Sequence, residues 1–271
     1  MSNMWDAGQY LRFGDERSRP FFDLLSQVRV TDPGYVADLG CGPGNLTAVL
    51  ARRWPGAEVV GVDSSAAMIT AAAESALPGG QVSFKLGDVR EWQPERPPDV
   101  LICNAVLQWV PGHHKLLVRW AGMLAPGGWL AFQLPGNFGQ PSHAIVREMA
   151  ASARWRSLLA DAELNRQAGD PAEYAELLAR PGYEVDAWET SYLHILPGEN
   201  PVLEWTKGTT LRPVLAALGE DQAASFLREY GERLRQVYSH GPFGTMFPFR
   251  RVFTVLHRLA DPGLSESDNV N

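Results

Sequence analysis

The sequence predicts an α/β protein built on a doubly wound, mainly parallel β-sheet. Three observations lead to this fold class. Strand and helix patterns alternate with short connections through the first half of the chain, a turn with Gly40, Gly42 and Gly44 follows the first strand pattern, and the next two strand patterns end in acidic residues. Such alternation produces βαβ units, whose parallel strands place ligands at their carboxyl ends.

Each element of the first half follows from its apolar pattern. Apolar runs between turn residues predict strands over 35–40, 57–65, 81–88, 99–105 and 127–136. A helix is expected after the first strand because one helical face is apolar, with Leu46, Val49, Leu50 and Trp54. An alanine-rich helix over 64–75 follows the second strand and ends at the Leu-Pro-Gly-Gly sequence of 77–80.

The second half is more helical. Helices are expected over 143–160 and 171–180, an alternating strand over 183–196, an amphipathic helix over 221–239 and a final strand over 249–259. We therefore expect four parts: an N-terminal helical segment (1–34), a core (35–197 plus 246–260), a helical cap inserted between the last two strands (198–245), and a flexible tail (261–271).

Composition narrows the class of protein. The 271 residues carry 24 Lys+Arg against 31 Asp+Glu, a net charge of -7, which argues against a surface that coats nucleic acid or anionic lipid. The two cysteines, Cys41 and Cys103, lie in apolar strand-like surroundings and indicate a reducing compartment. The start of the chain lacks a signal-peptide pattern and no apolar run reaches membrane-spanning length, so we expect a cytoplasmic protein. The histidines show no metal-binding spacing.

The glycine turn "VADLGCGPGNLT" (36–47) predicts a ligand site. Such turns serve nicotinamide dinucleotides, flavins, nucleoside triphosphates and S-adenosylmethionine. A dinucleotide turn needs a third glycine where Asn45 stands, and Asp38 would repel a pyrophosphate. The positive charges of S-adenosylmethionine would instead be attracted to Asp38, while Asp63 suits ribose hydroxyls and Asp88 the adenine amine. The alternatives are a turn without ligand, Asp63 as a helix cap, and Asp88 as an ordinary turn residue.

Five stretches in order carry a family resemblance: "VADLGCGPGNLT", "GVDSSAAM", "GDVREW", "ICNAVLQWV" and "LAPGGWLAF". Over about residues 35–135 the chain resembles the class I S-adenosylmethionine-dependent methyltransferases. The resemblance implies a Rossmann-like, seven-stranded sheet whose last strand is antiparallel. It also implies a set of cofactor-binding residues: Asp38, Gly40, Gly42 and Gly44 for the methionine part, Asp63 for the ribose, with Ser64 and Met68 beside it, Asp88 and Val89 for the adenine, and Asn104 and Ala105 at the sulfur end.

The flanking stretches "YLRFGDERSRPFFDLL", "WETSYLH", "TLRP" and "FPFRR" are similar to the trans-aconitate 2-methyltransferases. This similarity implies the formation of a methyl ester on a small polycarboxylic acid. The expected substrate residues are Tyr10, Arg19, Gln108, Trp109, Asn137, Tyr192, His194, Arg212 and Arg250. For two of them a simpler reading stays open, since His194 also suits a surface histidine and Arg250, with Arg251, a solvated strand edge.

The expected chemistry needs no catalytic base, because a carboxylate is already ionised near neutral pH. Residues 104–107 read Asn-Ala-Val-Leu, which lacks the Asn-Pro-Pro-Tyr/Phe tetrad of adenine-N6 methyltransferases, and neither cysteine follows a proline as the nucleophile of cytosine-C5 enzymes does. Two alternatives remain open: a methyltransferase with another small-molecule O or N acceptor, and a non-catalytic S-adenosylmethionine-binding protein.

Overall fold

A computed structural model describes residues 14–74 and 80–260, with side chains from Ser18 on. The chain divides into two compact units. The sheet unit comprises Ser18–Leu134, Gly169–Glu189 and residues 252–260, and the helical unit comprises Pro135–Ala168 and Thr190–Arg251. Of the predicted site residues, Tyr10 lies outside the described residues.

The sheet follows the strand order β3-β2-β1-β4-β5-β8-β6. Its strands are β1 (Tyr35–Leu39), β2 (Glu58–Asp63), β3 (Val82–Leu86), β4 (Val100–Asn104), β5 (Trp129–Pro135), β6 (Tyr183–Leu196) and β8 (Gly244–Arg258), and a two-residue strand, β7 (His240–Gly241), pairs with β8. The strands from β1 to β5 pair in parallel.

The last strand, β8, is antiparallel to its neighbour β5. The Gly136 N–H donates to the Arg250 carbonyl and the Arg258 N–H donates to the Gly128 carbonyl, so residue numbers fall along β8 as they rise along β5. This antiparallel strand and the seven-membered main order confirm the predicted fold class, with β7 as a short addition.

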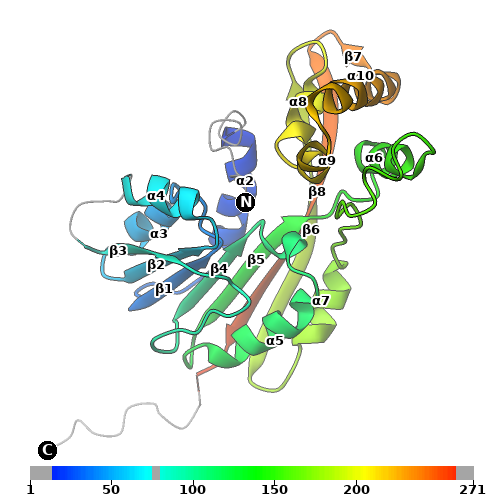
Figure 1. The fold of residues 1–271 in the computed structure, drawn as a ribbon. Helices are drawn as coiled ribbons and strands as arrows, with labels where there is room; N and C mark the ends of the chain where they lie inside the picture. Colours follow the sequence, from blue (N-terminus) through cyan, green and yellow to red (C-terminus); the bar gives the residue numbers. More distant parts are fainter. Residues whose placement is uncertain (1–13, 75–79, 261–271) are drawn as a thin grey trace, which may run out of the picture. The chain divides into compact units, whose positions relative to one another are not determined.

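Helices cover both faces of the sheet unit. They are α2 (Gly14–Ser26), α3 (Thr47–Arg53), α4 (Ala66–Glu74), α5 (His113–Met123) and α7 (Pro171–Leu178). Figure 1 shows α3 and α4 on one face and α5 and α7 on the other. This division follows from the strand order, because right-handed crossovers to either side of β1 place their helices on opposite faces. The switch at β1 and β4 marks the ligand end of such a sheet.

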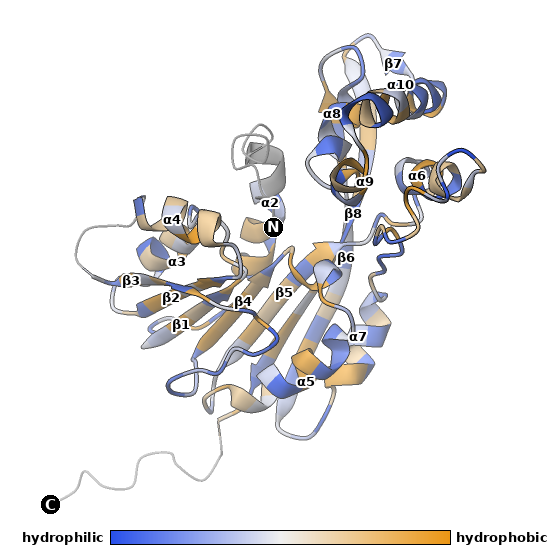
Figure 2. Cartoon of the chain, in the orientation of Figure 1, coloured by the Kyte–Doolittle hydropathy of each residue, from blue (hydrophilic) through white to orange (hydrophobic). Residues whose placement is uncertain are grey.

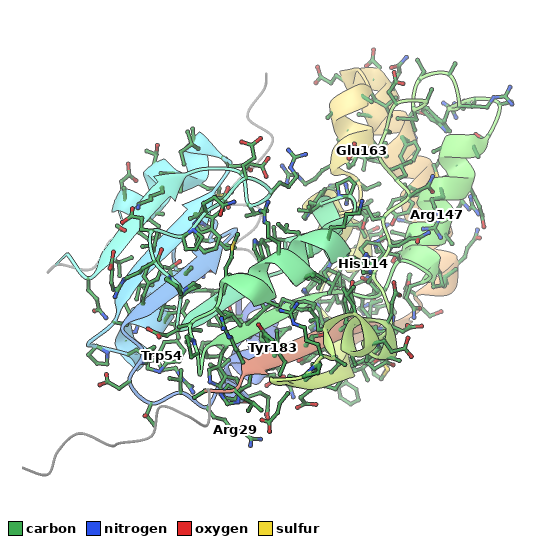
Figure 3. The ribbon with its side chains drawn as sticks, turned by 90° about the horizontal axis from the view of Figure 1, so that it is seen from below. Arg29, Trp54, His114, Arg147, Glu163 and Tyr183 are labelled. Carbon is green, nitrogen blue, oxygen red and sulfur yellow. The ribbon has the colours of Figure 1, made fainter. Side chains whose placement is uncertain are left out.

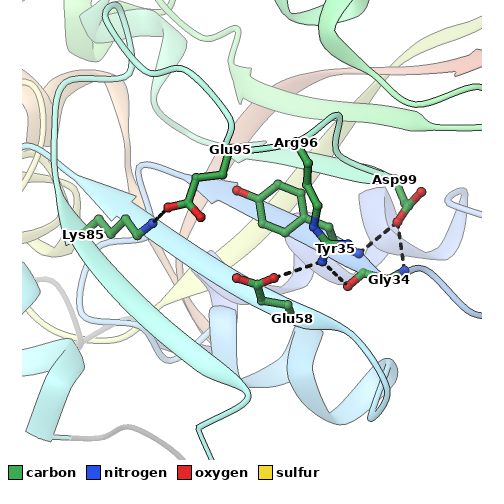
Figure 4. A network of polar contacts seen from close by, with 7 residues as sticks. All are labelled: Gly34, Tyr35, Glu58, Lys85, Glu95, Arg96 and Asp99. Carbon is green, nitrogen blue, oxygen red and sulfur yellow. Dashed lines mark hydrogen bonds and ion pairs between the residues drawn. The ribbon is translucent and has the colours of Figure 1, made fainter.

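The middle of the sheet is its core. Every residue of β1 is buried, and four of the five residues of β4 are buried. Figure 2 shows β4 mainly in apolar colours. At the amino end of β1, the Asp99 carboxylate accepts hydrogen bonds of 2.9 Å from the Gly34 and Tyr35 N–H groups, and Arg96 joins Glu58 to the Gly34 carbonyl (Figure 4). This network anchors the strands at the end away from the glycine turn.

The helical unit has a hydrophobic cluster of its own. Its helices are α6 (Pro141–Ala151), α8 (Pro201–Lys207), α9 (Arg212–Ala217) and α10 (Glu220–Val237). They pack around large aromatic side chains, among them Trp155, Trp205, Phe226, Tyr230 and Phe247. Among the described residues, no helix is both long and apolar enough to cross a membrane.

Two predicted boundaries are wrong. The helix expected over 143–160 ends at Ala151, because Ser152 adopts an extended conformation (φ -66°, ψ 157°) and the following residues form turns that bury Trp155. The final strand begins at Gly244, before the predicted residue 249. Gly244 has φ +123° and a Cβ there would lie 2.7 Å from the Leu196 carbonyl oxygen, so glycine allows the strand to start at this close approach.

Candidate active site

The glycine turn after β1 needs its glycines. Gly40, Gly42 and Gly44 all have positive φ, at 79°, 56° and 79°. A Cβ on Gly40 would lie 2.1 Å from the Val106 side chain, so that position is closed by packing. A Cβ on Gly42 would meet nothing within 4 Å, which leaves open space where its backbone turns. The turn therefore combines a tight strand exit with a backbone that a ligand can approach.

Asp63 at the end of β2 joins the turn to the next strand. Its carboxylate accepts hydrogen bonds from the Gly42 N–H at 3.0 Å and from the Ser65 N–H at 2.8 Å. Burial raises the pKa of this carboxyl, and the two N–H groups oppose that rise. Each oxygen keeps a further lone pair for a hydroxyl donor, so the predicted ribose contact suits the geometry.

Asp38 on β1 is a buried carboxylate. Only 2% of it is exposed, and one oxygen accepts a hydrogen bond of 2.6 Å from the Thr47 hydroxyl. Burial raises the pKa of Asp38 to about 6; the Thr47 hydrogen bond opposes this rise and the charge of Asp63 adds to it. Two neighbouring carboxylates make this end of the sheet attractive to a cation.

The other predicted donor residues lie along the same strand ends. Ser64 is exposed beside Asp63, and Met68 on α4 and Val89 after β3 are buried. Asp88 is held by its neighbour, since both its oxygens accept from the Arg90 guanidinium and Oδ1 also accepts from the Arg90 N–H. This pairing lowers the pKa of Asp88. An adenine amine at Asp88 would share the carboxylate with Arg90.

A polar network follows β4. Ala105 has φ 57°, a left-handed conformation that is rare for a residue with a Cβ. The Gln108 amide N–H donates to the Ala105 carbonyl at 2.6 Å, and the Ala105 N–H donates to the Gln133 carbonyl at 2.9 Å. Gln133 in turn donates to the Asn104 side-chain oxygen at 2.5 Å. Backbone strain held in place by side chains is a feature of functional sites.

Three predicted acceptor residues lie in the sheet unit. The Gln108 side-chain oxygen is buried and has no hydrogen-bond partner among the described residues. Trp109 closes the short helical turn of Leu107–Trp109 and is half-buried. Arg19 on α2 is different, because its side chain is 72% exposed and lies 3.9 Å from the Asp23 carboxylate.

The remaining predicted acceptor residues belong to the helical unit. Asn137 is 1% exposed, and neither polar atom of its side-chain amide has a partner among the described residues. Tyr192 and His194 point to the covered face of β6 as the alternation predicts, and the His194 ring packs 4.9 Å from that of Trp205. Arg212 begins α9 and is half-buried. Arg250 donates to the Gly136 carbonyl at 3.2 Å.

Sequence reasoning missed several polar residues. Thr47 supports Asp38, and Gln133 stands out as a polar residue inside an otherwise apolar strand. His143 and Arg147 are four residues apart on α6, and with Arg166 they line a pocket of the helical unit. The four-residue spacing of His143 and Arg147 could have indicated that they share one face of α6. The position of Arg166 depends on tertiary structure.

Metal ligands and nucleophilic cysteines are two other features on which an active site can depend. Within residues 14–74 and 80–260, no group of three or more His, Cys, Asp or Glu side chains is arranged to hold a metal ion. Cys41 and Cys103 are both buried free thiols, and burial raises the pKa of each. A thiol with a raised pKa is a poor nucleophile, so both act as small apolar side chains.

The sequence is similar to those of known proteins. Residues 36–128 match the methyltransferase domain family. The chain is 52% identical over 262 residues to a trans-aconitate 2-methyltransferase of Streptomyces avermitilis, which covers 94% of this chain and 97% of that one. It is 47% identical over 255 residues to a trans-aconitate 2-methyltransferase of Mycobacterium tuberculosis, with 93% and 96% covered.

Solved structures support the fold. The YcgJ protein of Bacillus subtilis aligns with a TM-score of 0.57 at 12% identity, over 90% of this chain and 99% of that one. Phosphoethanolamine N-methyltransferase 2 of Haemonchus contortus, solved with S-adenosyl-L-methionine, aligns with a TM-score of 0.54 at 16% identity, over 90% of this chain and 53% of that one. With sequence identity of about half over almost the full length, the chain belongs to the trans-aconitate 2-methyltransferase family of class I S-adenosylmethionine-dependent methyltransferases.

Proposed function

We propose that this protein transfers a methyl group from S-adenosylmethionine to a carboxylate of trans-aconitate and forms a methyl ester. The observation that carries the proposal is the near full-length identity to trans-aconitate 2-methyltransferases, together with the acid-lined glycine turn. The direct test is a labelled-methyl transfer assay against a panel of organic acids, in which a base-labile product identifies an ester. Transfer to an amine or a hydroxyl, with trans-aconitate left unmodified, would contradict the proposal.

The residues at the strand ends suit the donor. Gly42 would let the backbone approach the methionine part, beside Gly40, which we assign by resemblance, and Asp38 would face its positive charge. Asp63 would accept the ribose hydroxyls. We assign the remaining contacts by resemblance: Gly44, Ser64 and Met68 beside the turn, Asp88 and Val89 at the adenine, and Asn104 and Ala105 at the sulfur end.

The transfer requires alignment more than acid–base chemistry. S-adenosylmethionine supplies the methyl group, which passes in line from sulfur to a carboxylate oxygen. Orientation of the two reactants can lower the barrier by roughly 7–11 kcal/mol. The hydrogen bonds that fix Ala105 and Asn104 would hold the wall of the donor site rigid. A carboxylate nucleophile carries no proton to remove, so no residue of this chain needs to act as a base.

The kcat at saturating donor and acceptor is therefore expected to be nearly flat between about pH 6 and 8. Initial rates of ester formation across this range check the prediction. A steep rise with a midpoint near pH 7 that disappears in His194→Gln would instead indicate a general base and another class of acceptor.

Donor affinity is expected to depend on pH at lower values. Because the pKa of Asp38 is raised to about 6, a growing fraction of this carboxyl is protonated as the pH falls through 6. A cationic donor favours the ionised carboxylate, so its affinity should fall by up to about tenfold per pH unit below that value. Calorimetry from pH 5 to 8 measures this effect. Asp38→Asn should remove the pH dependence of donor affinity. Equal donor affinity of the wild-type protein at pH 5 and pH 7.5 would contradict the prediction.

The helical unit offers the groups that an acid acceptor needs. Arginine forks recognise spectator carboxylates, and Arg212 and Arg250 are the predicted candidates. Asn137 adds a buried amide with unused hydrogen-bonding capacity. We propose that residues 198–245 act as a cap that selects the acceptor. We propose that the aromatic packing of Tyr192 and His194 supports this cap. The residues of the sheet unit that we propose to contact the acceptor are Gln108, Trp109 and Arg19.

We further propose a cytoplasmic enzyme that acts on small molecules and not on nucleic acid. The two buried free thiols suit a reducing compartment. The net charge of -7 disfavours a surface for nucleic acid.

A further inference from the structure

We propose that His113 and Tyr174 position the turn that follows β4, and through this turn the sulfur end of the donor site. The turn spans residues 105–110 and carries Gln108 and Trp109. His113 begins α5, and Tyr174 lies on α7, 61 positions further along the chain. The inference rests on the proposed function, because it takes this turn as a wall of the site.

His113 is a buried, neutral histidine. Burial lowers its pKa from the ordinary value of 6.5, and the charge of His114 adds to this effect. Hydrogen bonding to the backbone of Val110 and Leu107 and the charge of Glu173 oppose the decrease in pKa. Because the net shift is downward, the His113 ring is uncharged at about pH 7.5 and carries a proton on only one nitrogen.

The hydrogen bonds of this neutral ring have one consistent direction. Nδ1 of His113 lies 3.2 Å from the Val110 carbonyl oxygen, which can only accept, so Nδ1 carries the proton. Nε2 is then an acceptor, and it lies 2.9 Å from the Tyr174 hydroxyl. Burial raises the pKa of Tyr174 to about 12, so its hydroxyl keeps the proton that it donates to the ring. The same hydroxyl accepts from the Gly169 N–H at 3.1 Å. The ring therefore joins the end of the turn to α7.

Aromatic packing keeps the His113 ring in this orientation. His114, the next residue of α5 (Figure 3), stacks on His113 and on Tyr174, with ring centroids 4.6 and 5.6 Å apart. Phe132 on β5 packs edge-on against Tyr174 at 5.3 Å. A ring that rotated out of these contacts would lose both hydrogen bonds and the stacking together. The N–H group of Nδ1 is therefore held toward the Val110 carbonyl.

The turn is thus supported at both of its ends. The hydrogen bonds from Gln108 and to Gln133 hold Ala105 in its left-handed conformation at the start of the turn. His113 holds Val110 at the other end. A displacement of about 1 Å in a group that aligns the reactants can cost about 100-fold in rate. We therefore expect the hydrogen bond to Val110 to affect methyl transfer, and not only stability.

Two substitutions of His113 separate its two hydrogen bonds. His113→Asn keeps an N–H donor near the position of Nδ1, whereas His113→Gln keeps an acceptor oxygen near the position of Nε2. The Gln variant should lower kcat by about 10- to 100-fold and raise the Kd of S-adenosylhomocysteine by about 5- to 30-fold. The Asn variant should stay within about threefold of the wild-type protein in both quantities. Thermal unfolding of both variants distinguishes a loss of stability from a loss of position.

Tyr174→Phe tests the same chain of hydrogen bonds from α7. It keeps the aromatic packing and removes the hydroxyl that fixes the tautomer, so kcat should fall by about 3- to 10-fold. Nitrogen NMR of the histidine rings should find the Nδ1–H tautomer of His113 in the wild-type protein and a mixture of tautomers in this variant. His257→Gln is the control, because His257 stacks on Trp129 at the amino end of β5. Its kcat and Kd should stay at the wild-type values.

Three results would overturn the inference: an Asn variant that loses as much kcat and affinity as the Gln variant, a Gln variant with wild-type values, or the Nε2–H tautomer in the wild-type protein. If neither His113 variant folds, unchanged kcat and Kd in Tyr174→Phe would overturn it. Failure of the proposed function is distinct, because the wild-type protein would then form no ester from trans-aconitate. The Kd values for S-adenosylhomocysteine would still test the positioning role.

Discussion

Replacing Asp63 by alanine is expected to weaken S-adenosylmethionine binding by about 1.5–3 kcal/mol, which is roughly 10- to 150-fold in Kd. The variant loses the acceptor proposed for the ribose hydroxyls. It also leaves the Gly42 and Ser65 N–H groups without the carboxylate that they now donate to, at 3.0 and 2.8 Å. Both losses act on the same ligand, because the glycine turn and the end of β2 would no longer be tied together. Isothermal calorimetry measures the change.

Two further variants distinguish the role of the Asp63 oxygen acceptors from the general effect of removing an acidic side chain. Asp63→Asn keeps one oxygen acceptor and the size of the side chain, so it should lose less affinity than alanine. Asp32→Ala is the control for removing an acidic side chain in the same unit, since Asp32 is exposed before β1. Wild-type affinity in Asp63→Ala would remove Asp63 from the donor site. Tight binding of NADH without any binding of S-adenosylmethionine would contradict the whole assignment of the turn.

The glycine turn and the strands around it were largely predictable because their determinants are local. The strand before Gly40, the glycines themselves and the acid at Asp63 lie within short βα units, where sequence order and spatial order agree. The structure adds what spacing alone does not contain. Examples are the hydrogen bond from Thr47 to Asp38 and the pairing of Asp88 with Arg90.

The helical unit was less predictable because its contacts join distant residues. The Thr210 hydroxyl contacts the His143 ring although the two residues are 67 positions apart in the sequence. No periodic sequence pattern predicts such a pair. The end of α6 at Ala151 was also missed, because the turns after it keep Trp155 buried as a longer helix would. Apolar periodicity indicates which residues are buried. A helix that ends at Ala151 and a longer helix would both satisfy the apolar pattern, so the pattern does not distinguish them.

The two units differ in the charge of the polar side chains that we assign to ligand binding. The sheet unit presents carboxylates, Asp38 and Asp63, which suit the cationic donor. In the helical unit, Arg147 and Arg166 line one pocket, and the charge of Arg212 helps to lower the pKa of Arg166.

Substitution of Arg212 or Arg250 by alanine is expected to cost about 2–4 kcal/mol in kcat/KM for trans-aconitate, mainly through a higher KM. Arg212 is half-buried at the start of α9, and Arg250 is tethered to the Gly136 carbonyl at 3.2 Å. A substrate carboxylate that loses such a partner would stay desolvated without compensation. Steady-state kinetics with trans-aconitate measure the loss, and calorimetry should find donor affinity unchanged.

The remaining variants test whether acceptor binding requires the bidentate geometry of the guanidinium or only its positive charge. Arg212→Lys and Arg250→Lys should recover part of the loss, because an ammonium supplies charge without bidentate geometry. Arg235→Ala is the control, since Arg235 is exposed in the last turn of α10. The loss should also grow with the number of carboxylates on the acid tested. If both alanine variants keep the wild-type KM for every acid, the helical unit does not recognise polycarboxylates, even if the protein methylates another acceptor.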